Sequence, residues 1–244
     1  MSTKKTDAFG AFLLAHFEAG TPSAELIERD DSFIDFGSQP GLYFSEYDSW
    51  SPAERELMDL AREPVLDIGC GAGRHSLHLQ NNGLNVIAID NSPGAIEVCT
   101  RRGLRNAMVL SATEVGRLER GGFSTVLMLG NNFGLLGSPR RAKRILRALH
   151  SITGDGAAIL AGTRDPYRTS DPNHLGYHRR NRGRGRMAGQ IRMRVRYRKI
   201  VGPWFDYLLV SPSEMSDVVA GTGWTVERLI DPGSANYHAV IRRA

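Results

Sequence analysis

Residues 65–74 read VLDIGCGAGR, and this stretch decides the fold. Its apolar run leads into three alternating glycines: Gly69, Gly71 and Gly73. Glycines at such a turn let backbone N–H groups approach a ligand closely. Asp67 precedes them, and Asp90 ends the next apolar run, where a carboxylate can accept both hydroxyls of a ribose. The unit is therefore predicted to bind a nucleoside.

A dinucleotide fits this loop poorly. Its fingerprint, G-x-G-x-x-G, requires a third glycine at the position where Arg74 stands. Asp67, placed close to a pyrophosphate, would repel it by on the order of 1 to 4 kcal/mol at dielectric constants between those of water and of a protein surface. A nucleoside with a cationic amine and no phosphate fits better. S-adenosylmethionine has these properties, and its sulfonium adds a positive charge.

The chain from residue 64 onward alternates strand-like and helix-like patterns. Strands are predicted over 65–69, 85–90, 107–111, 124–130 and 156–163, and helices over 74–82, 93–103, 114–120 and 139–151. Runs that are apolar on successive residues suit strands covered on both faces. Alternation of strand and helix implies parallel pairing with right-handed crossovers. The sequence therefore predicts an α/β fold.

VLDIGCGAGR followed by VIAID resembles the first two motifs of the class I S-adenosylmethionine-dependent methyltransferases, and the likeness covers about residues 50–165. It implies a Rossmann-like, seven-stranded, mostly parallel sheet whose antiparallel final strand, NYHAVIRR, lies near one edge. It also implies S-adenosyl-L-methionine as cofactor, with the glycines around its methionine part, Asp67 near its amino group, Asp90 on the ribose and Asn91 beside the adenine. The expected cofactor contacts are Asp67, Gly69, Cys70, Gly71, Gly73, Arg74, Asp90, Asn91, Ala112, Thr113, Leu129 and Asn131.

Two positions depart from the family pattern. The third motif usually carries an aspartate that contacts the adenine, and this chain has Ser111-Ala112-Thr113 there. Backbone groups, or Thr113 and Glu114, are the expected substitutes. The fourth motif often reads Phe-Asp, and here it reads Phe123-Ser124.

The domain organisation follows from the segments around this core. Residues 1–50 are predicted to form an N-terminal helical and aromatic lid, with a helix over 7–19. Residues 51–244 are predicted to form the methyltransferase domain. Within it, 165–211 is an inserted substrate-side element, a basic β-hairpin in which IRMRVRYRKI alternates apolar and basic residues and WFDYLLVS returns.

The net charge of +5 is concentrated in one segment. Residues 164–200 hold 12 Lys and Arg against two acids, Asp165 and Asp171, so the remainder of the chain is net acidic. An arginine face could bind an anionic small substrate, or residues 179–199 could follow an RNA backbone. Alternatively, the arginines could only keep an edge hairpin from adding strands. No separate RNA-binding module is recognisable, which favours a compact acceptor.

No side chain stands out as a catalytic base. Methyl transfer depends largely on positioning, and a base is needed only where the acceptor must lose a proton. Weak catalytic candidates are Asn131, Asn132, Tyr43, His174 and His178. Residues expected to contact the substrate are Tyr43, Tyr47, Asn132, Arg164 and Tyr177. The two asparagines lack the Pro-Pro-aromatic continuation of the DNA and protein amide methyltransferases, so that chemistry is not indicated.

The leading hypothesis is a methyltransferase acting on an N or O atom of a small molecule. RNA methylation and a non-catalytic S-adenosylmethionine-binding protein are the alternatives. Two cysteines make no disulfide framework, which favours a reducing, cytoplasmic setting. No apolar run is long enough to span a membrane, no metal site is predicted, and a homodimer is a possible assembly.

Overall fold

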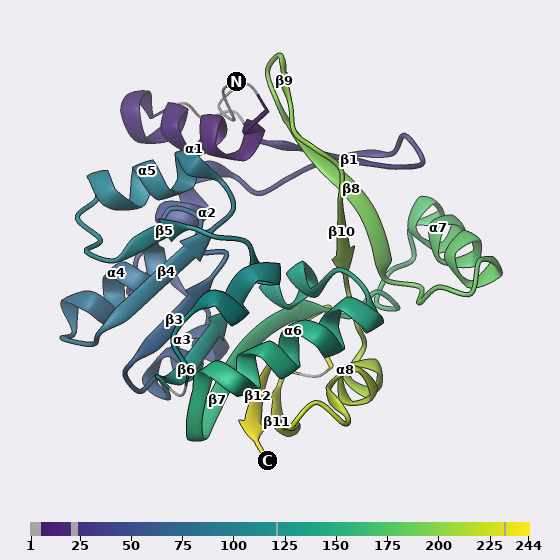
Figure 1. Ribbon diagram of the computed structural model, residues 1–244. Helices are drawn as coiled ribbons and strands as arrows, with labels where there is room; N and C mark the ends of the chain where they lie inside the picture. The colour runs from purple at the N-terminus through teal and green to yellow at the C-terminus, as the bar shows by residue number, and fades with distance from the viewer. Residues whose placement is uncertain (1–5, 21–23, 121, 232) are drawn as a thin grey trace.

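The computed structural model describes residues 6–20, 24–120, 122–231 and 233–244, which form two sheets with helices around them (Figure 1). In these residues the larger sheet has seven strands in the order β11-β12-β7-β6-β3-β4-β5. The strands are β3 (Val65–Ile68), β4 (Val86–Asp90), β5 (Ala107–Val109), β6 (Phe123–Met128), β7 (Thr153–Arg164), β11 (Trp224–Ile230) and β12 (Asn236–Arg243). The strands from β7 to β5 pair in parallel, whereas β12 is antiparallel to both β7 and β11. The predicted α/β class and the insertion of NYHAVIRR near one edge are confirmed.

Serine caps begin the helices that pack on this sheet. A serine hydroxyl accepts a backbone N–H at the start of α3 (Pro52–Asp59), α5 (Pro93–Arg101), α6 (Pro139–Ile152) and α8 (Pro212–Val219), and a proline follows each serine. This pairing satisfies the free N–H groups of the first turn. Helix α4 (Arg74–Asn81) instead begins at Gly73, directly after the glycine loop. The helix predicted near 114–120 is the 3₁₀ helix η3 (Ala112–Arg117).

The second sheet of the described residues has five strands and combines two distant parts of the chain. Its strands are β1 (Leu26–Arg29), β2 (Ile34–Phe36), β8 (Gln190–Tyr197), β9 (Ile200–Val201) and β10 (Phe205–Leu208). The predicted hairpin is present as β8 and β10, which pair antiparallel. Strands β1 and β2 were not predicted, and β1 pairs with the other edge of β8. We call this five-stranded sheet the small sheet.

Helix α7 (Pro172–Gly183) is a further element without a prediction. Its sequence, PNHLGYHRRNRG, has no apolar residues at helical spacing, so periodicity could not reveal it. The helix stands beside the small sheet, away from the seven-stranded sheet (Figure 1).

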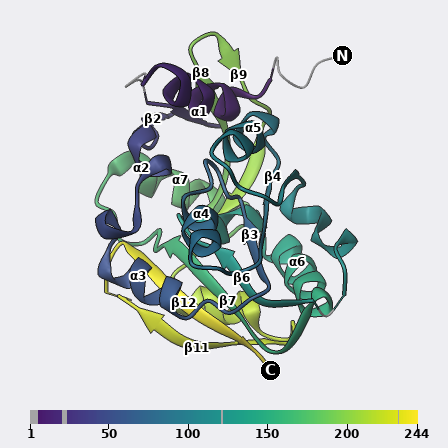
Figure 2. The ribbon, with the colours of Figure 1, turned by 90° about the vertical axis from the view of Figure 1, so that its left-hand side faces the viewer.

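Helix α1 (Ala8–Ala19) rests on the start of α5, as both ribbon views show (Figures 1 and 2). The carboxylate of Asp7 caps α1 through the N–H of Gly10 and also accepts from the hydroxyl of Ser92 and the N–H of Gly94. The two backbones touch, since a Cβ on Gly94 would lie 2.7 Å from the Cα of Gly10. Together with α2 (Pro40–Phe44), α1 covers the carboxyl ends of β3 and β4.

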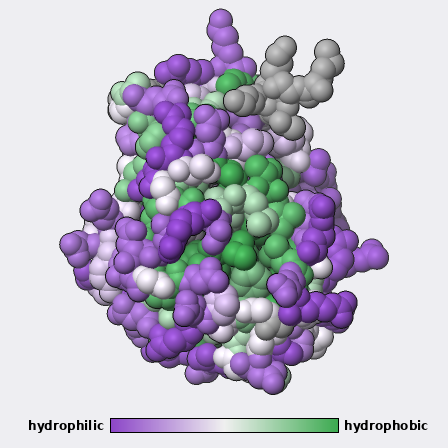
Figure 3. Space-filling view, turned by 60° about the vertical axis from the view of Figure 1, so that its left-hand side comes forward, coloured by the Kyte–Doolittle hydropathy of each residue, from purple (hydrophilic) through white to green (hydrophobic). Residues whose placement is uncertain are grey.

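Apolar side chains gather in the middle of one face and are bordered by polar ones (Figure 3). Among the described helices, none combines the length and apolar character needed to cross a membrane.

Candidate functional site

The glycine loop between β3 and α4 requires glycine for both conformation and space. Gly69, Gly71 and Gly73 have φ angles of 74°, 55° and 79°, in the left-handed region that favours glycine. A Cβ on Gly69 would lie 2.7 Å from Nδ2 of Asn132, and one on Gly71 would lie 3.3 Å from Cδ1 of Tyr43. The loop is therefore a narrow cradle between the end of β6 and the helices above it.

Asp90 ends β4 beside this cradle and is 7% exposed. Its two oxygens accept the N–H groups of Gly71 at 3.1 Å and Ser92 at 2.9 Å. Burial raises the pKa of Asp90 to about 6, although the two backbone hydrogen bonds oppose that shift. A buried carboxylate of this kind is a strong acceptor for ligand hydroxyl groups.

Asp67 lies beneath the same loop and is 2% exposed. The hydroxyl of Ser76 on α4 donates to its Oδ2 at 2.7 Å, and burial raises the pKa of Asp67. Cys70 and Cys99 pack below the loop with their sulfurs 3.8 Å apart. The contact with Cys99 and burial hold the pKa of Cys70 far above its usual range, so the thiol stays protonated and fills space.

Arg74 and Glu54 join the loop to helix α3. The guanidinium of Arg74 donates to Glu54 at 2.5 Å and to the Ser45 hydroxyl at 3.1 Å. Glu54 is also 2.8 Å from Nε2 of His75. These contacts fix the start of α4 and with it the position of the loop.

The two asparagines after β6 contact the loop and the small sheet. The amide nitrogen of Asn132 donates to the carbonyls of Ile68 and Gly69 at 2.9 and 2.8 Å, so this side chain holds the cradle in place. The carbonyl of Asn131 accepts the hydroxyl of Tyr207, on β10, at 2.5 Å. Tyr207 was not among the predicted site residues, because only the fold brings β10 to the end of β6.

Tyr43 is the predicted acceptor residue that the structure brings to the loop. Its ring lies over Gly71 and beside Phe9, with ring centroids 5.3 Å apart. Its hydroxyl donates to Glu25 at 2.6 Å. Glu25, the residue before β1, is a second buried group that the sequence analysis missed.

Other predicted residues have different surroundings. The Tyr47 hydroxyl donates to Asp59, and the Tyr47 ring stacks on His78. The Tyr177 hydroxyl donates to Asp30 and accepts the N–H of Arg192, which joins α7 to the small sheet.

The two candidate histidines of α7 also pack locally. The His174 ring packs edge-on against Phe33, and the His178 ring lies near Tyr167. Burial lowers the pKa of His178. None of these contacts involves the glycine loop.

The remaining cofactor and substrate candidates lie at strand ends. Asn91 is exposed directly after β4, and Arg164 is exposed at the end of β7. Ala112 and Thr113 begin η3, where the Ser111 hydroxyl caps Thr113 and Glu114 completes the capping box. Leu129, buried after β6, belongs to the apolar core.

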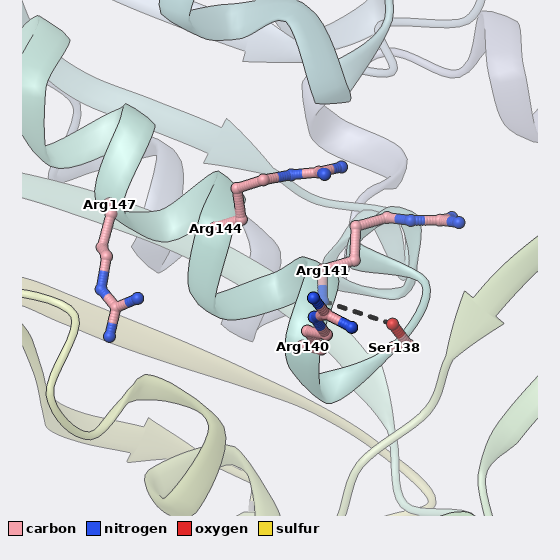
Figure 4. A pocket seen from close by; sticks show the side chains of 5 residues that line it. All are labelled: Ser138, Arg140, Arg141, Arg144 and Arg147. Atoms are coloured by element: carbon pink, nitrogen blue, oxygen red, sulfur yellow. Dashed lines mark hydrogen bonds between the residues drawn. The ribbon is translucent and has the colours of Figure 1, made fainter.

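A cavity of about 500 Å³ lies against α6, away from these groups, and is lined by Ser138, Arg140, Arg141, Arg144 and Arg147 (Figure 4). The side chains come from one helix and its cap, and Arg141 is paired with Asp206 at 3.2 Å. Because none of its lining residues contacts the glycine loop, we assign the candidate site to the loop and Asp90 and not to this cavity.

Comparison with known proteins places this geometry in a family. Residues 65–156 match the model of a methyltransferase domain. A SAM-dependent methyltransferase from Bacteroides fragilis, solved in complex with S-adenosyl-L-homocysteine, is 25% identical and aligns with a TM-score of 0.84 over 100% of this chain and 98% of that one. The chain therefore contains a methyltransferase domain and is similar over its whole length to a SAM-dependent methyltransferase. A methyltransferase from Methanosarcina mazei shares the fold, with a TM-score of 0.61 at 15% identity over 80% of this chain and 98% of that one.

Curated relatives match the chain over less than half of its length. A glycine/sarcosine N-methyltransferase from Parasynechococcus marenigrum is 25% identical over 116 residues, 46% of this chain and 41% of the relative. An uncharacterized methyltransferase from Mycobacterium tuberculosis is 33% identical over 92 residues, 37% of this chain and 36% of the relative. The chain thus spans about two fifths of the length of these relatives.

Proposed function

We propose that the protein transfers a methyl group from S-adenosylmethionine to an N or O atom of a small-molecule acceptor. The observation that carries this proposal is the hydrogen bond between the glycine cradle and Asp90. Both lie beneath α1, α2 and the small sheet. S-adenosylmethionine is the donor indicated by the methyltransferase-domain match and by the similar structure solved with S-adenosyl-L-homocysteine.

The residues present fit that donor. Asp90 would accept the ribose hydroxyls, and Asp67 would face the amino group. The left-handed glycines allow a ligand to approach the backbone where any side chain would clash. The bound donor supplies the methyl group on a positively charged sulfur, and the chain supplies binding, orientation and exclusion of water.

The acceptor would lie between the end of β6 and the small sheet. Tyr43 of α2, Tyr207 of β10 and the backbone of Asn131 border that region. A small acceptor fits a site that aromatic side chains cover in this way. The glycine/sarcosine N-methyltransferase, whose name describes a compact amine acceptor, supports the same class.

The arginines of β8 give little support to RNA as acceptor. Glu28 accepts from Arg194 at 2.8 Å and from Arg196 at 2.7 Å, and Asp206 accepts from Arg192 at 3.1 Å. These three arginines hold the small sheet together. Arg179, Arg182, Arg184 and Arg186 of the same segment are exposed, and an RNA acceptor would have to use them.

Calorimetric titration with S-adenosylmethionine, followed by turnover with donor carrying a labelled methyl group, tests the proposal. We expect one binding site, weakened at least about tenfold by Asp90→Ala, which removes hydrogen bonds to the ribose. The exposed Asp217→Ala serves as the control and should leave the affinity unchanged. The label should enter the small-molecule fraction of a cell extract. Label found only in RNA, or no transfer at all, would contradict the proposal.

A further inference from the structure

Glu25 is a buried acid that the methyl-transfer proposal has not used. It is 4% exposed, and its Oε1 accepts the hydroxyl of Tyr43 at 2.6 Å. Its side chain is held closely, since a Cβ on Gly37 would lie 2.3 Å from its Cγ. Among the described ion pairs, none includes Glu25. The fold therefore encloses a carboxylate without providing a cation for it.

The acid lies at the site proposed for donor and acceptor. Its partner Tyr43 has its ring over Gly71, 3.3 Å from where a Cβ of that glycine would stand. Tyr207, whose hydroxyl donates to the carbonyl of Asn131, has its pKa raised by burial first and by the charge of Glu25 second. Glu25 is thus part of the boundary between the glycine loop and the end of β6.

A neighbouring acid shows what a purely structural carboxylate looks like in this sheet. Glu28 lies three residues along the chain, and hydrogen bonds from Arg194 and Arg196 lower its pKa to about 2. Burial instead raises the pKa of Glu25, and hydrogen bonds from the Tyr43 hydroxyl and the Ser38 backbone oppose that only in part. Burying a carboxylate without a cation costs free energy, and a bound ligand of opposite charge can offset that cost.

We propose that Glu25 is the countercharge for an organic cation bound beneath α2 and the small sheet. This inference rests on the proposed function. Two sources could supply the cation, namely the sulfonium of the methyl donor and an ammonium group of the acceptor. Both present a compact positive charge with alkyl substituents to an acid that aromatic rings surround.

The first arm of the test compares three ligands with one skeleton by calorimetric titration: S-adenosylmethionine, sinefungin and S-adenosylhomocysteine. The first two are cationic beside the ribose, and the third is neutral there. If the donor is the source of the cation, Glu25→Gln should weaken the binding of the two cationic ligands by about five- to twentyfold. This range is expected for the loss of one charge–charge interaction at intermediate distance and dielectric constant. S-adenosylhomocysteine should change less than about twofold, so the ratio of affinities cancels any general effect on folding.

The second arm tests the acceptor as the source. With S-adenosylhomocysteine saturating, melting temperatures are measured in trimethylammonium chloride and in potassium chloride of equal ionic strength. Stabilisation of the wild type by trimethylammonium, absent in Glu25→Gln, assigns the cation to the acceptor. Glu28→Gln is the matched control, since it removes a neighbouring carboxylate that already has cationic partners, and it should behave as the wild type in both arms.

Two results distinguish failure of the countercharge proposal from failure of the proposed methyltransferase function. Normal binding of all three ligands, with Glu25→Gln indistinguishable from the wild type in both arms, would overturn the countercharge and leave the proposed function standing. A wild-type chain that binds none of the three would overturn both.

Discussion

Carboxylates of the small sheet are paired with arginines, whereas those of the glycine cradle are buried with backbone and hydroxyl partners. In the small sheet, Glu28 and Asp206 each accept from two arginines. In the cradle, Asp90 is buried and accepts the backbone N–H groups of Gly71 and Ser92. Burial raises the pKa of Asp90 to about 6, whereas hydrogen bonds from two arginines lower that of Glu28 to about 2. Paired charges hold an architecture together, and buried acids without cations mark the place where a ligand completes the site.

The largest effect is expected from the cradle backbone. Gly69→Ala should lower the free energy of unfolding by about 2 to 4 kcal/mol, because alanine is strained at a φ of 74° and its Cβ would strike Asn132. Gly41→Ala, on α2, is the control, since a Cβ there meets no atom within 4 Å and alanine favours helix. Chemical denaturation measures both variants. Equal stability of the two would show that the cradle is not a constrained structure.

The pH dependence of stability tests the unpaired acid. Because the folded pKa of Asp90, about 6, exceeds that of an ordinary aspartate, its contribution is fully present below the unfolded pKa near 4 and is lost as pH rises through 6. Asp90→Asn should therefore gain about 2 to 3 kcal/mol relative to the wild type between pH 4 and pH 7. Denaturation curves over this range measure the difference. Parallel stability curves for the two proteins would mean that Asp90 has an ordinary pKa.

The smallest effect is expected on RNA affinity, when arginines of the small sheet lose their acidic partner. Wild-type affinity for single-stranded RNA should be weak, with a salt slope that counts about one phosphate or fewer. Glu28→Gln releases Arg194 and Arg196 and should raise that affinity about two- to threefold at low salt. Filter binding over a salt series measures this. A wild-type slope of several phosphates would show that the arginines are available, and would favour an RNA acceptor.

Sequence reasoning succeeded where the signal is local. The cradle and Asp90 lie within one strand–loop–helix–strand unit, and the central parallel strands of the larger sheet are largely apolar runs. It failed for β1 and β2, which are four and three residues long. β1 pairs with β8, more than 150 positions later, and β2 pairs only with β1. Such strands have too few residues for a recognisable period.

The acceptor side was predictable only in part, for the same reason. Tyr43 was among the predicted residues, but Glu25 and Tyr207 come together only when β1 and β10 join the small sheet. Asn132 was expected near the reacting methyl group, and the fold uses its amide to hold the loop. The chemistry of a side chain could be predicted from its residue type, whereas its partner depends on strand pairing between distant parts of the chain.

The most direct test of the central claim is a crystal structure of the chain with S-adenosylhomocysteine. We expect the ribose hydroxyls on Asp90, the amino acid part along Gly69–Gly73, and the sulfur facing the region bordered by Tyr43 and Tyr207. A crystal soaked with that ligand in which the cradle stays empty, or in which a pyrophosphate-bearing nucleotide binds there instead, would contradict the account.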